Sequence, residues 1–202
     1  MKAKLVKDEF ETQCWCNRIV ADPYQVLSEA FTTSDMVQLR RFIRMMLQYS
    51  ESNRVYKKDS PGEVLINMRL IRSLIRAARK LKEKKKGPVE VLESDVLNKS
   101  FYCLNYLPEA EWDQFPRFVS MNEYCNPYKL FRKFFNCQTI DQWVYDWEKM
   151  VDCALSPYRG EQDLQLISFY IRLSKLVEAA HLIYLRDVNH LRGVFNKLPI
   201  EE

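Results

Sequence analysis

Apolar residues recur at helical spacing over residues 60–86, and this pattern predicts the longest helix of the chain. Ser60 is predicted to be the N-cap, with Pro61 at the first helical position and Glu63 closing a capping box. Gly87 and Pro88 are predicted to end the helix, which would be roughly 39 Å long at about 1.5 Å per residue. The predicted core positions are Leu65, Met68, Ile71, Leu74, Ile75, Ala78 and Leu81.

A similar pattern occurs later in the chain. Residues 22–31 (DPYQVLSEAF) are similar to residues 126–135 (NPYKLFRKFF), which lie 104 residues further on. Asp22 and Asn126 each precede a proline, so both segments are predicted to begin with an N-cap and a proline at the first helical position. The helical spacing then continues in parallel over residues 36–47 and 140–151, and over residues 65–81 and 167–183.

These matched segments predict an all-α fold, a helical bundle built from an internal duplication of a three-helix unit. The first repeat spans residues 22–86 and the second spans residues 126–192. A single unit would expose an apolar stripe that a second unit can bury, so we expect residues 1–202 to form a single all-α body. The connector, residues 87–125, is acidic, aromatic and predicted to be partly helical, and three of its aromatic residues are expected to pack on the second repeat: Phe115, Phe118 and Tyr124.

Composition and charge refine this picture. With 47% hydrophobic and 29% charged residues, the chain has the composition of a folded globular protein. The net charge of +4 is unevenly distributed, because the first repeat holds fifteen Lys and Arg against seven Asp and Glu, whereas the connector holds two against seven. The sequence shows no secretory signal pattern and no apolar run of about 18 residues, and the six cysteines are scattered. These features predict a cytoplasmic protein with reduced thiols and no membrane partner.

Five Lys and Arg side chains on the long predicted helix form a row that could bind an anion. They fall within about 80° of one another on a helical wheel, so the row could follow a phosphate backbone. The alternative is a solvated face, or one neutralised by the acidic connector. Only the first repeat carries the row, since the residue of the second repeat that aligns with Arg76 is Glu178. The predicted anion or nucleic-acid site consists of Arg69, Arg72, Arg76, Arg79 and Lys80.

The loop before each long helix is a second candidate site for interaction. Tyr56 and Lys57 occupy this loop in the first repeat, and Tyr158 and Arg159 occupy it in the second. A tyrosine has an apolar ring and a polar tip, so we expect each ring to pack at the turn between its two helices. A recognition loop is the alternative.

Other patterns do not predict catalysis. His181 is predicted to be a half-buried polar group, and Arg186 and His190 to lie at a solvated helix end, because they are closer in sequence than the Arg/His pairs of helical ribonuclease sites. Cys14 and Cys16 lack the spacing and the partner ligands of a zinc site. The sequence therefore predicts no metal, no cofactor and a non-enzymatic protein; an enzyme that uses a site between the two repeats is the third hypothesis.

Three motifs resemble those of uncharacterised helical proteins of Bacteroidetes-type bacteria. They are Asn126-Pro127-Tyr128, Lys57-Lys58-Asp59 and Leu74-Ile75-Arg76-Ala77-Ala78. The resemblance implies a bacterial cytoplasmic protein and carries no function.

The sequence thus predicts a non-enzymatic helical interaction or regulatory protein that presents a surface to a protein partner or to itself. Nucleic-acid binding through the basic helix, residues 69–86, is the alternative. No small-molecule ligand is inferred from the sequence.

Overall fold

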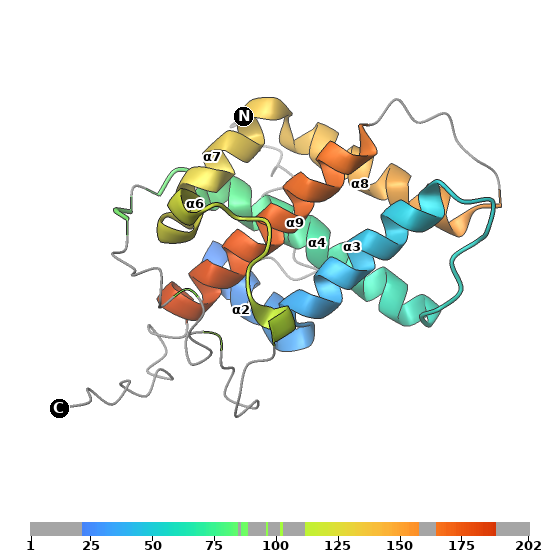
Figure 1. The fold of residues 1–202 in the computed structure, drawn as a ribbon, viewed down its shortest axis with the longest axis horizontal. Helices are drawn as coiled ribbons and strands as arrows, with labels where there is room; N and C mark the ends of the chain where they lie inside the picture. The colour runs from blue at the N-terminus through green and yellow to red at the C-terminus, as the bar shows by residue number, and fades with distance from the viewer. Residues whose placement is uncertain are drawn as a thin grey trace, which may run out of the picture.

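The computed structural model describes residues 22–84, 86–88, 96, 102, 112–157 and 165–188. All regular elements in these ranges are helices, so the fold is all-α (Figure 1). The α-helices are α2 (Pro23–Thr33), α3 (Met36–Ser50), α4 (Pro61–Leu81), α6 (Met121–Cys125), α7 (Pro127–Cys137), α8 (Ile140–Leu155) and α9 (Leu166–Ile183). A 3-10 turn, η2 (Trp112–Gln114), precedes α6, and a π-helical turn, η3 (Tyr184–Val188), continues α9.

The predicted helix starts are confirmed. Ser60 Oγ accepts a hydrogen bond from Glu63 N, and Glu63 Oε2 accepts one from Ser60 N at 2.8 Å, which together make the capping box of α4. Asp22 caps α2 and Asn126 caps α7, each through its side chain and each followed by proline at the start of the helix.

The end of α4 differs from the prediction. The helix stops at Leu81, so its 21 residues span roughly 32 Å rather than continuing to residue 86. The lysines that follow would repel one another on successive helical turns. Instead, the main-chain carbonyls of Lys82 and Lys84 accept hydrogen bonds from Arg132 on α7, at 3.1 and 3.4 Å.

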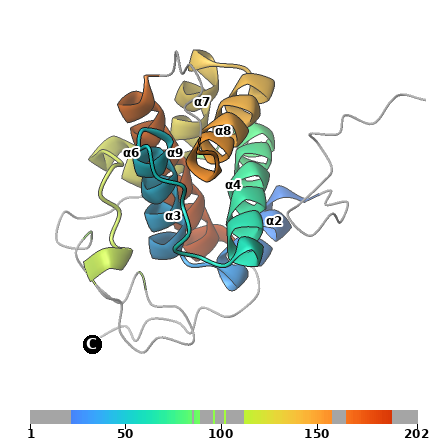
Figure 2. The same cartoon turned by 90° about the vertical axis from the view of Figure 1, so that its right-hand side faces the viewer.

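The four longest helices of the described residues form the centre of the bundle. Figure 2 shows α3 and α9 on one side and α4 and α8 on the other, and contacts also join α3 to α8 and α4 to α9. The shorter helix α2 packs on α4, and α7 packs on α9 in the corresponding way. No helix in the described part of the chain is both long and apolar enough to cross a membrane.

Two fully buried tryptophans on α8 hold this core together. Trp143 stacks on Phe134 of α7 with 3.9 Å between ring centroids. Trp147 meets Phe42 of α3 edge-to-face at 5.9 Å, and its indole N–H donates to the main-chain oxygen of Met68 on α4 at 3.0 Å. The contact between the two halves is therefore largely apolar and aromatic at this point.

Two tyrosines 104 residues apart meet where α2 and α7 begin. The hydroxyls of Tyr24 and Tyr128 are 3.0 Å apart, and Tyr128 donates to Asp187 Oδ2 at 2.5 Å. Because a hydroxyl has one proton, Tyr24 is then the donor to Tyr128. Lys86 Nζ lies 5.6 Å from each tyrosine ring and 3.0 Å from Asp187 Oδ1. Burial, followed by the hydrogen bond to Asp187, raises the pKa of Tyr128 above its ordinary value.

Two of the three connector aromatics predicted to pack on residues 126–192 contact that part of the chain, and Phe115 lies against Tyr102, with 4.7 Å between ring centroids. Phe118 meets Tyr170 of α9 edge-to-face at 5.5 Å, and Arg186 lies over the Tyr124 ring at 4.4 Å. The connector also reaches the first repeat, through contacts of η2 with α3. Most of residues 87–111 lie outside the described residues.

Candidate anion-binding pocket

The five cations of the predicted row do not share one open face. Arg76 is buried, with 7% of its surface exposed. Arg72 donates to Glu148 on α8 at 2.9 Å. This difference from the prediction arises because α8 packs on α4, which a helical wheel of α4 alone does not show. The remaining three are half-buried: Arg69, Arg79 and Lys80.

The predicted interaction loop is described in the first repeat only. The Tyr56 ring is buried and meets Tyr49 edge-to-face at 5.0 Å. Its main-chain N–H donates to Ala154 at 2.8 Å, and its hydroxyl donates to Asp59 Oδ2 at 2.5 Å. This environment agrees with packing at the turn, whereas Lys57 is exposed. Tyr158 and Arg159, like Cys14, Cys16 and His190, lie outside the described residues.

We expect Tyr56→Phe to lower the free energy of unfolding by about 1.5 to 3 kcal/mol, because it removes a hydrogen bond to a carboxylate. Tyr56→Ala should cost more, because it also leaves a cavity. Thermal denaturation measures both, with Tyr145→Phe as the control, since Tyr145 is 59% exposed. A Tyr56→Ala variant that melts like the wild type would contradict a structural role for this ring.

A basic pocket lies between α3, the segment after η2 and α9. Its volume is about 260 Å³. Four arginines and a single aspartate give it a positive charge, and two aromatic rings supply an apolar wall. The residues of the basic pocket are Val37, Arg40, Arg41, Arg44, Asp113, Arg117, Phe118 and Tyr170.

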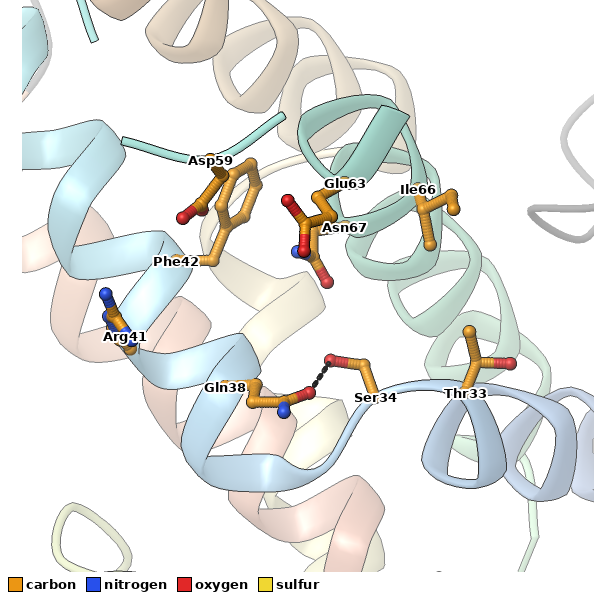
Figure 3. Close-up of a pocket in the computed structure, with 9 residues that line it drawn as sticks. All are labelled: Thr33, Ser34, Gln38, Arg41, Phe42, Asp59, Glu63, Ile66 and Asn67. Atoms are coloured by element: carbon orange, nitrogen blue, oxygen red, sulfur yellow. Dashed lines mark hydrogen bonds between the residues drawn. The ribbon is translucent and has the colours of Figure 1, made fainter. Parts of the chain in front are cut away.

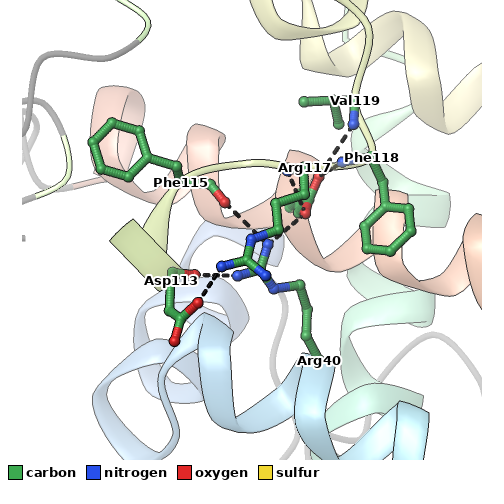
Figure 4. A network of polar contacts seen from close by, with 7 residues as sticks. Arg40, Asp113, Phe115, Arg117, Phe118 and Val119 are labelled. Atoms are coloured by element: carbon green, nitrogen blue, oxygen red, sulfur yellow. Dashed lines mark hydrogen bonds and ion pairs between the residues drawn. The ribbon is translucent and has the colours of Figure 1, made fainter. Parts of the chain in front are cut away.

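A buried ion pair forms one edge of the basic pocket (Figure 4). Arg40, which is 8% exposed, reaches from α3 to the fully buried Glu178 of α9, with 2.7 Å between Nη1 and Oε1. The same guanidinium also donates to the main-chain oxygens of Phe115, at 3.0 Å, and Asp113. Arg40 is therefore already neutralised and is a structural member of the pocket.

Glu178 also holds the main chain of the connector. Its Oε1 accepts from Arg117 N at 2.8 Å, and its Oε2 accepts from Phe118 N at 2.8 Å and from Val119 N at 3.1 Å. One carboxylate thus satisfies three main-chain donors and one guanidinium, which compensates for its burial. This anchor fixes the segment that brings the Arg117 and Phe118 side chains to the basic pocket (Figure 4).

The exposed arginines of the basic pocket differ in their pairing. Arg41 and Arg44 form no hydrogen bond or ion pair with any other residue that the structure describes, and Arg117 pairs with Asp113. Phe118 and Tyr170 form the neighbouring aromatic pair. Guanidinium groups without a partner in the described part of the chain, beside aromatic rings, suit a carboxylate or phosphate that is attached to an apolar group.

His181 lies near this network, and its ring is buried against Phe31, with 5.0 Å between centroids. Burial, followed by the charge of Arg40, lowers the pKa of His181 to about 3. The imidazole is therefore neutral at physiological pH and is more deeply buried than predicted. Within the described residues, no group of three or more His, Cys, Asp or Glu side chains could hold a metal ion.

The sequence did not identify Glu178 and Arg40 as a pair. The available signal was a single acidic residue within the apolar run Leu176–Ala180, since a charge at such a position is rarely buried without a partner. The position of Arg117 in the basic pocket depends on a contact about 60 residues away in sequence, for which no local pattern exists.

Comparison of the chain with protein-family models, curated proteins and solved structures found no match. The resemblance to bacterial helical proteins therefore stays a prediction, and function is inferred from the pockets and surfaces described above.

Proposed function

We propose that the chain is a non-enzymatic interaction protein that binds an acidic segment of a protein partner through the basic pocket. The observation that carries this proposal is the pair of exposed guanidinium groups of Arg41 and Arg44 at one opening, neither of which has a hydrogen-bond or ion-pair partner among the described residues. Carboxylates of a partner would pair with them, and an adjacent apolar side chain would contact Phe118 and Tyr170. A partner of opposite charge would also be attracted from a distance.

The shape of the site favours a peptide over a nucleic acid. A volume of about 260 Å³ accommodates one or two side chains, whereas a phosphate backbone needs a longer track of cations. On α4 that track is interrupted at Arg72 and Arg76. Nucleic-acid binding remains the second candidate, because Arg69 and Lys80 on α4 are only half-buried and have no ion pair with any residue that the structure describes.

We also infer that the two halves arose by duplication of the three-helix unit. Three features support this origin: the matched helix lengths, the shared N-caps of α2 and α7, and the corresponding packing of α2 on α4 and α7 on α9. The contact between Tyr24 and Tyr128 joins positions that are equivalent in the two repeats. The basic pocket has no such symmetry, since Glu148 occupies the position equivalent to Arg44.

A cytoplasmic location is part of the same proposal. Cys125, Cys137 and Cys153 are free thiols, as expected in a reducing compartment.

The experiment is a fluorescence-anisotropy titration with a labelled peptide of four glutamates around a central tyrosine. We expect Arg44→Glu to weaken binding by about tenfold or more, because a charge-assisted hydrogen bond contributes about 1.5 to 3 kcal/mol. Lys129→Glu is the matched control, since it changes the net charge equally on an exposed position of α7 outside the basic pocket.

Two results would contradict the proposal. One is the absence of peptide binding at low salt, and the other is an equal loss in the Arg44→Glu and Lys129→Glu variants. A labelled DNA duplex and a labelled single strand are titrated in parallel. If these bind and Arg69→Glu/Lys80→Glu weakens their binding, the second candidate replaces the first; the two changes avoid the buried and paired arginines of α4.

A further inference from the structure

A second pocket lies between α3 and the first turns of α4 (Figure 3). Its volume is about 280 Å³. Unlike the basic pocket, it is lined by acids, amides, hydroxyls and one arginine, and we call it the mixed-charge pocket. Its residues are Thr33, Ser34, Gln38, Arg41, Phe42, Asp59, Glu63, Ile66 and Asn67.

The two walls of the mixed-charge pocket carry opposite charge. Figure 3 shows Gln38 and Arg41 on α3, whereas Asp59 lies in the loop before α4 and Glu63 on α4. Local structure places both acids: Glu63 closes the capping box of α4, and Asp59 accepts the hydroxyl of buried Tyr56. Hydrogen bonding with Ser60 lowers the pKa of Glu63, so this carboxylate is charged at neutral pH.

These charges do not neutralise one another. Arg41 forms no ion pair with Asp59 or Glu63 among the described residues, although all three line one pocket. Asp59 uses only Oδ2 and Glu63 uses only Oε2 in the hydrogen bonds formed within the described ranges. Each acid therefore keeps one oxygen available to accept a hydrogen bond, and the guanidinium keeps its donors.

We infer that the mixed-charge pocket binds a small zwitterion of the α-amino-acid class. The ammonium group of the ligand faces Asp59 and Glu63, and its carboxylate faces Arg41. The apolar surfaces of Phe42 and Ile66 contact its side chain. A ligand carrying both charges bridges the two walls, which a simple amine or a simple carboxylate cannot do.

This inference goes beyond the proposed function, because the mixed-charge pocket and the basic pocket have only Arg41 in common. Glu63 and Asn67 line the mixed-charge pocket alone, and Arg44 and Arg117 line the basic pocket alone. Variants at these positions therefore test the two sites separately.

The test is an NMR titration of the ¹⁵N-labelled chain of 202 residues that follows the side-chain amides of Gln38 and Asn67. The probes are L-leucine, isoamylamine, which lacks its carboxylate, and isocaproate, which lacks its ammonium group. We expect saturable shifts with leucine at a dissociation constant of about 1 mM or below, and at least about tenfold weaker binding of the other two.

Glu63→Gln and Arg41→Gln should each weaken leucine binding by about tenfold or more. Glutamine at position 63 still closes the capping box, so that variant keeps its helix start. Arg44→Gln is the matched control and should bind leucine as the wild type does. No saturable shift with leucine, equal binding of either single-charge probe, or unchanged leucine binding in Glu63→Gln would overturn the inference.

Discussion

Glu178→Gln is expected to lower the free energy of unfolding by about 3 to 5 kcal/mol, because it leaves the buried Arg40 guanidinium without its counter-charge. The substituted amide also turns an N–H₂ group toward main-chain donors that the carboxylate accepted. For a chain of this size, the loss corresponds to a fall in Tm of about 6 to 20 °C. Thermal and denaturant unfolding measure it, and hydrogen exchange should become faster at the amides of residues 117–119.

Two controls separate the causes of this loss. Glu83→Gln removes an exposed pair with Arg79 and should change stability by less than about 1 kcal/mol. The double variant Arg40→Met/Glu178→Met removes both buried charges, yet it still leaves the main-chain donors of residues 117–119 without an acceptor. It should therefore recover only part of the loss. Full recovery would mean that the main-chain anchor contributes nothing, and a Glu178→Gln variant as stable as Glu83→Gln would contradict the prediction.

Acidification from pH 7 to pH 5 is expected to destabilise the wild type by about 2 kcal/mol through His181. Its pKa is about 3 in the folded state and about 6.5 in the unfolded chain, so the unfolded state binds more protons between these values. Stability therefore falls as the pH falls through this window, and the fall ends near pH 3. The total is about 5 kcal/mol, at about 1.4 kcal/mol per pKa unit.

The window from pH 7 to pH 5 is diagnostic because ordinary carboxylates titrate below it. Burial raises the pKa of Glu123, but hydrogen bonds from Lys175 and Ser120 outweigh this effect and lower it to about 2, so its contribution is lost at still lower pH. His181→Phe should flatten the dependence of Tm on pH between 7 and 5, whereas His190→Asn, at the only other histidine, should not. An equally steep dependence in His181→Phe would assign the effect to other groups.

Features determined by a few adjacent residues could be predicted from the sequence. The capping box of Ser60 and Glu63 and the N-caps Asp22 and Asn126 depend on side chains that reach their own helix, so the prediction needed no tertiary information. The all-α class followed from apolar spacing for the same reason.

Features determined by which helices meet could not be predicted in this way. The periodicity of α4 defines one apolar stripe, but the helix contacts α2, α3, α7, α8 and α9, and Arg76 is buried as a result. The predicted core position Leu65 is 47% exposed, whereas Leu70, outside the predicted stripe, is fully buried. Arg41 and Arg44 on α3 line a pocket only because the connector residues Arg117 and Phe118 lie beside them, and this contact has no pattern in the local sequence.

The way in which Glu178 holds the connector has an evolutionary consequence. Its bonds go to main-chain N–H groups, which nearly every amino acid supplies, so they do not restrict the side chains at positions 117, 118 and 119. Substitutions there can accumulate without loss of the anchor, provided that proline is avoided, since it has no N–H to donate. Substitutions of Arg117 and Phe118 could therefore change which ligand the basic pocket binds during evolution, while the helices that support the pocket stay the same.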